Sequence, residues 1–318
     1  MADELDLLRN ANPVPTDGPH YGDGPLDGRA EQHLARLMRG GTPRRGRGRM
    51  WALAASAVVA ALVSALLLSG RTTAPAVAAP RPLVVRADTT PVTLDALAAR
   101  AQARADGSPA LRKGTHVQSW SLGMSDDEPP VTLPEERVVR WHADDSRTEV
   151  VVATDPRHPG RPVLTGEGEA VDDGHVLSRR TYPPSWSDAP PQSPPPGDPA
   201  RLRAYLREAA YSRTDLTTGE LLDTVDELLD TWTLGDRESA ALARLLADTG
   251  DLRPAGEVTD RLGRRGLAYV LDRSGTREML IMDPATGAVL GLETTFTRAQ
   301  PEYGVKAGDV MAYRAWMR

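Results

Sequence analysis

The residues most able to carry out chemistry are sparse in this chain. Cysteine is absent, which excludes disulfides, thiolate zinc sites and a cysteine nucleophile. The six histidines are scattered, and no two of them lie three or four residues apart. A zinc site would therefore have to be assembled across strands. The histidines are His20, His33, His116, His142, His158 and His175.

Motifs for phosphate binding and for nucleophilic catalysis are also missing. A P-loop requires lysine followed by serine or threonine, but neither lysine of the chain, Lys113 or Lys306, is followed by one. A nucleophile elbow requires the pattern G-x-S-x-G, and the nearest stretch, residues 123–127, lacks the second glycine. We interpret that stretch as a turn between a strand and a loop.

Acidic residues cluster at 126–128, 144–145 and 172–173. None of these runs matches a calcium-binding loop, and each adjoins proline, serine or glycine, which indicates solvated turns. No pattern supports a carboxylate pair for glycoside hydrolysis. We therefore assign no catalytic, cofactor-binding or metal-ligating residue and expect no cofactor. The sequence predicts a protein that is not an enzyme; the alternative is a hydrolase whose polar residues converge in a deep pocket.

Tryptophan supplies one candidate contact residue. Trp186 lies in a proline-rich loop, residues 183–199, and is expected to be exposed for binding. Other tryptophans lie in strand or helix patterns and are expected in the core, namely Trp120, Trp141, Trp232 and Trp316.

An apolar stretch near the N-terminus predicts a membrane anchor. Residues 51–68 contain no charge, glycine or proline, and as a helix they would extend roughly 27 Å, close to the apolar thickness of a bilayer. With its flanks, this stretch predicts a transmembrane helix at 50–69. Arginines crowd its N-terminal side, so the positive-inside rule places the N-terminus in the cytoplasm. The alternative is a signal peptide cleaved after Ala78, although the lead-in before the stretch is longer than a signal peptide.

Composition divides the remainder into three parts. Residues 1–49 are dense in proline and glycine, which predicts a largely disordered cytoplasmic tail. Residues 70–91, rich in proline and alanine, predict a spacer. Residues 92–318 are long enough to bury a core and predict an extracytoplasmic domain. Because residues 70–318 hold 30 basic and 37 acidic side chains, this part is a poor match for nucleic acid.

Strand patterns flank a group of helical patterns in this outer domain. Asp198 with Pro199 begins one helix, Thr217 with Glu220 forms a capping box before the next, and Asp236 is expected to cap another. These patterns predict an α+β domain built on an antiparallel sheet. Strands are expected at 116–122, 137–142, 148–153, 267–272, 277–283, 288–296 and 309–316, with helices at 95–105, 201–210 and 238–248 and around 221–232.

Several runs resemble an uncharacterised family of actinobacterial single-pass membrane proteins. They are residues 3–9, the arginine-flanked apolar stretch, residues 256–266 and residues 279–291. The outer domain is in turn similar in layout to the lipoprotein-carrier and periplasmic sigma-factor-regulator fold. That resemblance implies a curved antiparallel sheet with helices on its concave side and an apolar groove for acyl chains or a peptide, which residues 221–246 would fill. The expected fold is thus α+β, with a single N-terminal transmembrane helix followed by an outer domain of a curved antiparallel sheet and a helical insertion.

Topology and resemblance together lead to three functional hypotheses. The first is a non-enzymatic envelope protein, a sensor or regulator whose outer domain binds a protein partner or a lipophilic ligand and whose inner tail conveys occupancy. The second is a tethered carrier or binder of lipid or lipoprotein. The third is an unrecognised extracytoplasmic hydrolase. The expected partners are the membrane and a protein of the envelope or cytoplasm, and no nucleic acid.

Overall fold

The computed structural model describes residues 80–317 apart from 87, 106–108, 126–128 and 185–188, together with Asp17–Gly18 (β1) and Tyr21–Gly22 (β2). The chain divides into two compact units, Met1–Arg71 and Thr72–Arg318. In the first unit β1 and β2 pair antiparallel. All other described elements belong to the second unit.

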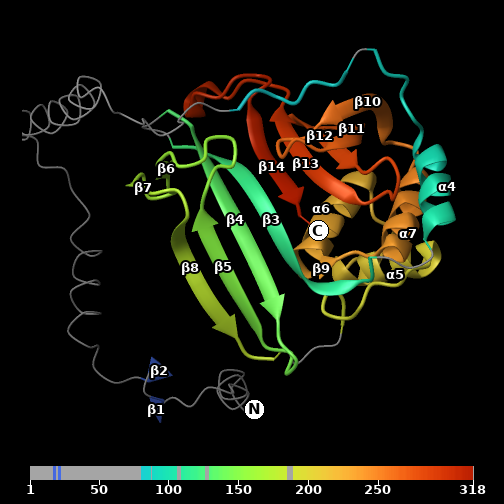
Figure 1. Ribbon diagram of the computed structural model, residues 1–318, viewed down its shortest axis with the longest axis horizontal. Coiled ribbons are helices and arrows are strands. Elements are labelled where there is room, and N and C mark those ends of the chain that lie inside the picture. Colours follow the sequence, from blue (N-terminus) through green and yellow to red (C-terminus); the bar gives the residue numbers. More distant parts are fainter. Residues whose placement is uncertain are drawn as a thin grey trace, which may run out of the picture. The chain divides into compact units, whose positions relative to one another are not determined.

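One large antiparallel sheet forms the second unit (Figure 1). Its strands follow the order β10-β11-β12-β13-β14-β3-β4-β5-β8, and the short β9 pairs with the start of β3. A separate hairpin pairs β6 (Val163–Leu164) with β7 (Ala170–Val171). The strands of the sheet are β3 (Arg112–Gly123), β4 (Val131–Trp141), β5 (Arg147–Ala153), β8 (His175–Tyr182), β9 (Trp232–Thr233), β10 (Arg253–Thr259), β11 (Arg265–Arg273), β12 (Thr276–Met282), β13 (Val289–Phe296) and β14 (Val310–Trp316).

Four helices pack against one face of this sheet. They are α4 (Leu94–Arg104), α5 (Pro199–Ala209), α6 (Thr218–Thr231) and α7 (Asp236–Ala247). The expected capping box of Thr217 and Glu220 is confirmed, as is the start of α5 at Asp198 and Pro199. The predicted cap at Asp236 is wrong, because Gly235 is the N-cap and Asp236 lies in the first turn.

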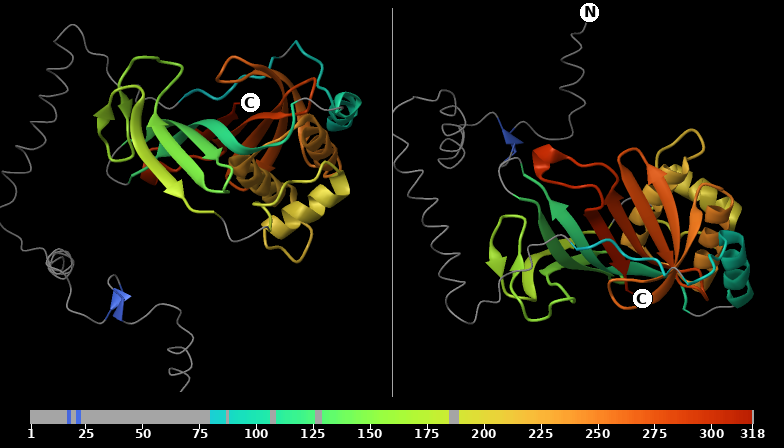
Figure 2. Two further views of the ribbon diagram at one scale, coloured as in Figure 1. Left: turned by 60° about the horizontal axis from the view of Figure 1, so that its bottom comes forward. Right: turned by 90° about the horizontal axis from the view of Figure 1, so that it is seen from above.

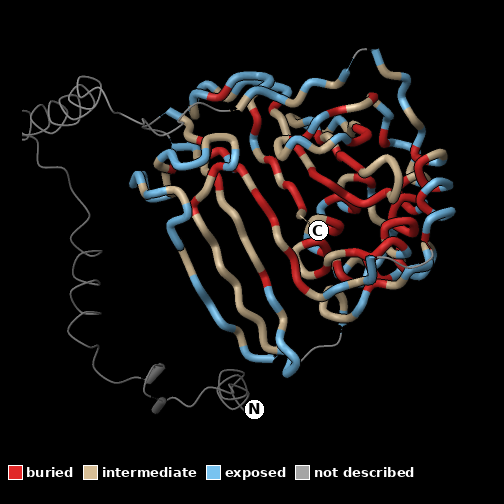
Figure 3. The backbone as a smooth tube through the Cα atoms, viewed as in Figure 1, coloured by how far each residue is buried: buried red, intermediate tan, exposed pale blue. Residues whose placement is uncertain are grey.

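The helices cover only part of the sheet. The main core joins leucines of α5, α6 and α7 to side chains from β11, β12, β13, β14 and β3. Figure 2 shows the helices gathered over that part. In Figure 3 the buried residues concentrate there, whereas β4, β5 and β8 are half-buried or exposed along most of their length. We call the part formed by β4, β5 and β8 the uncovered half-sheet.

A second, smaller core lies on the opposite face of the sheet. Trp120 and Tyr313 are fully buried there, with ring centroids 5.4 Å apart. Leu83 and Val85 from residues 80–86 pack over this cluster. Residues 80–86, which we call the strap, thus lie against the sheet on the face away from the helices.

The expectation of an α+β domain behind a transmembrane helix is wrong. Strands make up 37% of the described residues and helices 22%, so one large antiparallel sheet dominates the fold. The sheet was underestimated because several of its strands hold residue types that disfavour strands. β4 contains Pro134 and two glutamates, β8 contains two arginines and β10 contains Pro254 and Gly256.

Among the residues described, no helix is both long and apolar enough to cross a membrane. The predicted span at 50–69 and most of the tail at 1–49 lie outside the described residues.

Candidate binding surface

A row of alternating aromatic and cationic side chains crosses five neighbouring strands on the helix-bearing face. Lys113 Nζ lies 3.8 Å from the ring centroid of Trp141 and 5.8 Å from that of Trp232. The guanidinium of Arg147 lies 5.4 Å from the Trp141 ring and 4.2 Å from the Tyr182 ring. In strand order the row is Trp232 (β9), Lys113 (β3), Trp141 (β4), Arg147 (β5) and Tyr182 (β8).

The row runs from the buried core to the edge of the sheet. Trp232 is buried under the helices, and the other four side chains are half-buried. A cation within about 6 Å of an aromatic face is attracted by the ring quadrupole. The contacts of the row therefore link the strands of the uncovered half-sheet to the covered part of the sheet.

Ion pairs fasten α6 along its border with the uncovered half-sheet. Arg314 of β14 pairs with both Asp226 and Asp230 of α6. Arg137 of β4 reaches Asp230 at 3.3 Å and Glu149 of β5 at 3.1 Å. Successive carboxylates and guanidinium groups thus connect the helix to β14, β4 and β5.

Burial raises two carboxyl pKa values at this border. Burial and the repulsion of Asp230 raise the pKa of Asp226 to about 6, against the attraction of Arg314. Burial alone raises the pKa of Glu135. A carboxyl group of raised pKa could act as a general acid, but Asp226 is already paired with Arg314 of β14, on the side of α6 that faces the sheet. We therefore interpret it as part of the attachment of the helix.

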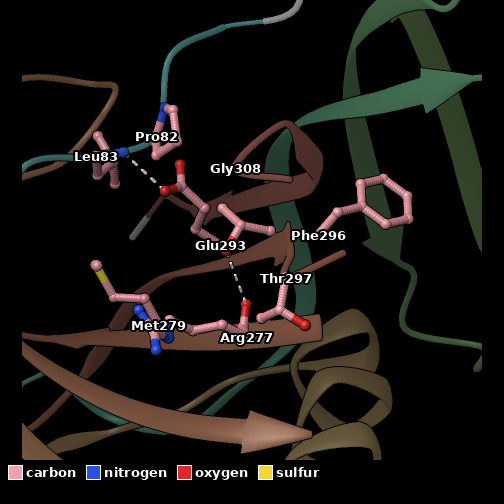
Figure 4. A pocket seen from close by; sticks show the side chains of 9 residues that line it. Pro82, Leu83, Arg277, Met279, Glu293, Phe296, Thr297 and Gly308 are labelled. Atoms are coloured by element: carbon pink, nitrogen blue, oxygen red, sulfur yellow. Dashed lines mark hydrogen bonds between the residues drawn. The ribbon is translucent and has the colours of Figure 1, made fainter. Parts of the chain in front are cut away.

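A pocket lies beside the strap on the opposite face (Figure 4). It has a volume of about 380 Å³. The carboxylate of Glu293 accepts a hydrogen bond from Leu83 N at 2.8 Å and pairs with Arg261, so both its oxygens are engaged. Its pKa is raised by burial. The lining residues are Pro82, Leu83, Arg277, Met279, Glu293, Thr295, Phe296, Thr297 and Gly308.

The space beneath the helices is filled by side chains. The leucines of residues 221–246 are buried in the main core, where they contact β11, β12 and β13. Beside Trp232 and Trp316 only about 20 Å³ is left. The apolar groove implied by the lipoprotein-carrier resemblance is therefore occupied in this region.

The histidines singled out from the sequence lie apart from one another. His116 pairs with Glu136, His142 bonds the hydroxyl of Thr148, and His158 Nδ1 lies 3.1 Å from Asp155. In the described part of the chain, no three histidines or carboxylates are grouped to hold a metal ion.

The sequence could not reveal the cation–aromatic row. Trp141 was expected in the core but is half-buried in this row, and Trp186 lies outside the described residues. Lys113, Trp141 and Arg147 come from separate strands, so their alignment depends on strand register. The only available signal was that Lys113 is one of two lysines in the chain.

No family model matches the chain, and no curated protein matches it in sequence. The resemblance to actinobacterial single-pass proteins stays a prediction.

Proposed function

We propose that this protein is a non-enzymatic binding protein that recognises a protein partner through its uncovered half-sheet. The observation that carries the proposal is that the sheet continues for three strands beyond the helical layer. Sheets normally bury at least one face, because the apolar side chains of strands must leave water. Here β5 carries the run Val150, Val151 and Val152, yet all three are half-exposed.

Four of the valines, Val138, Val150, Val152 and Val176, form a patch on the face away from the helices, whereas Val151 lies on the helix-bearing face opposite Arg137. Val138 of β4 lies directly opposite Val150, and Val152 lies opposite Val176 of β8, which is 45% exposed. Contiguous apolar surface of this kind commonly marks a protein interaction site. Polar and charged residues surround the patch, as at the rim of an interface.

Carboxylates elsewhere in the domain support binding more than catalysis. Asp226, Asp155 and Glu293 are each held by arginine. The pairs of Asp226 and Glu293 link two parts of the fold, and Asp155 pairs with Arg157 two residues along the chain. None of the three is hydrogen-bonded to a serine or threonine hydroxyl in the described residues, as a nucleophile and its base would be. No observation favours the lipid-carrier alternative, because the space beneath the helices is filled.

The expected location in the envelope and the expected signal through an inner tail concern residues 1–79. Apart from β1 and β2, these residues lie outside the described part of the chain. Both expectations stay predictions.

Site-specific photo-crosslinking in the native cell tests the proposed function. A photoreactive amino acid at Thr148 or Thr181, on the uncovered half-sheet, is expected to capture the same protein from both positions. Glu227, which is exposed on α6, is the matched control. The captured protein, once purified, must bind the full-length chain and suppress both crosslinks. Crosslinks only from Glu227, or none at Thr148 and Thr181, would overturn the proposal.

A further inference from the structure

The two edge strands of the large sheet, β10 and β8, differ in what covers their outer side. At the β10 end the strap and the residues just after it lie alongside the strand, since Arg86 N donates to Glu257 O at 2.8 Å and Glu257 N donates to Thr89 Oγ1 at 3.0 Å. β10 also carries Pro254 and a register shift before Gly256, both of which disfavour pairing with another strand. The chain thus protects this end itself.

The β8 end has no such cover among the described residues. β8 pairs with β5 on one side, and no described strand pairs with its other side. The strand has eight residues, and its exposed or half-exposed side chains include Val176. The backbone groups on its free side are a template for one more strand.

Charge on β8 defines what could pair there. Arg179 and Arg180 are adjacent and exposed, and the strand holds no acidic residue. Across the sheet Arg179 lies opposite Val150, and Arg180 lies opposite Glu149, which is paired with Arg137. Neither Arg179 nor Arg180 has an ion pair among the residues the structure describes. Because consecutive residues of a strand point to opposite faces, the two arginines present one positive charge on each face of the edge.

We infer that β8 binds an extended segment of the partner that carries two adjacent acidic residues, added to the sheet as a further antiparallel strand. This inference rests on the proposed function and names how the partner binds. Adjacent acidic residues in the added strand would meet Arg179 on one face and Arg180 on the other. A second copy of this chain is disfavoured as the occupant, because pairing β8 with β8 would bring two pairs of arginines together.

A peptide-binding measurement tests the inference with the full-length chain. The probe is a fluorescent peptide of alternating threonine and valine with Glu-Glu at its centre, followed by fluorescence anisotropy. The double substitution Arg179→Glu with Arg180→Glu is expected to weaken its binding by at least about tenfold, since two attractive cross-strand pairs become repulsive. A Lys-Lys version of the probe is expected to bind the double variant better than it binds the native chain.

Two controls separate strand addition from simple charge attraction. Arg298→Glu removes an exposed arginine distant in sequence from β8 and is expected to leave binding within about twofold, because long-range charge effects are screened by salt. A probe methylated on alternate backbone nitrogens keeps its charge but loses hydrogen-bond donors, and it is expected not to bind.

Certain results would overturn the inference. They are the absence of saturable binding by the Glu-Glu probe, equal binding of the methylated probe, or an equal effect of Arg298→Glu. If crosslinks at Thr148 and Thr181 persist while the probe fails, the binding function stands and the strand-addition mode is wrong. If those crosslinks are absent as well, the proposed function itself fails.

Discussion

Trp316 on β14 lies directly opposite Val117 on β3, although the two strands are far apart in the chain. Both side chains are buried in the core beneath the helices. This pairing of β14 with β3 joins the strands that come before α5 in the chain to those that come after α7. Within the sheet, β3 and the uncovered half-sheet are thus joined to β10–β13 through β14.

Replacing Trp316 should destabilise the whole domain. Trp316→Ala is expected to lower the free energy of unfolding by about 3 to 5 kcal/mol, because it removes a large buried side chain and leaves a cavity. Chemical denaturation followed by circular dichroism measures the effect. Met311→Ala on the same strand is the control, since Met311 is 38% exposed, and its effect should be much smaller. Equal effects of the two substitutions would contradict the central place of the β14–β3 pairing.

Asp155 is expected to stabilise the domain near neutral pH and to lose this effect at acid pH. Burial opposes its charge, but hydrogen bonds from Arg157 and His158 outweigh burial and lower the pKa to about 2. Trp120 Nε1 also donates to it at 3.2 Å. A folded-state pKa below the unfolded value means that this stability is present above about pH 4 and is lost as the pH falls towards 2.

Asp155→Asn should therefore lower the free energy of unfolding at pH 7 by about 2 kcal/mol, and the deficit should shrink below pH 3. Denaturant titrations at several pH values give the comparison. Asp172→Asn, at an exposed carboxylate in the same region, serves as the control. A deficit of the same size at pH 7 and pH 2.5 would show that the carboxylate charge is not the cause.

Local signals in the sequence predicted the helices better than the sheet. The capping box at Thr217 and Glu220 depends only on residues close in the chain, and the structure has it. Four of the strands beyond residue 260 also appear close to their expected places, from β11 to β14. β8 was not expected, because its arginines resemble a solvated loop unless the neighbouring strand is known.

The features that the sequence could not show depend on pairing between strands that are far apart in the chain. The pairing of β14 with β3 brings Trp316 next to Val117, and no pattern within either strand specifies it. The same holds for the candidate surface, since Lys113 meets Trp141 only when β3 and β4 pair in one register. A residue whose role depends on its cross-strand neighbour gives no signal of its own in the sequence.

The cation–aromatic row should show energetic coupling between its members. A double-mutant cycle of Lys113→Met with Trp141→Leu is expected to give a coupling free energy of about 0.5 to 1 kcal/mol, the size of a partly exposed cation–aromatic contact. Methionine keeps the aliphatic stem of Lys113, so the cycle isolates the charge. Lys306→Met, at an exposed lysine, is the control and should not couple with Trp141→Leu. Additive effects of the first pair would show that the row is an arrangement without energetic consequence.

Asp226 should make the domain less stable as the pH rises. Burial raises its pKa from 3.8 to about 6, so the folded state holds a proton that the unfolded state has already released between these values. Stability from this group therefore declines as the pH rises from about 4 to 6, and the penalty is fully present above that range.

Asp226→Asn removes this titration while keeping the shape of the side chain. We compare the free energy of unfolding of the variant with that of the native chain at two pH values. The difference, variant minus native, is expected to be about 2 kcal/mol larger at pH 7.5 than at pH 4. The substitution also removes the ion pair with Arg314, and comparing two pH values cancels that loss only in part. Asp223→Asn, at an exposed carboxylate on the same helix, therefore provides the reference. A pH-independent difference, or one of opposite sign, would mean that Arg314 compensates fully for burial and that α6 is fastened to the sheet without a charge penalty.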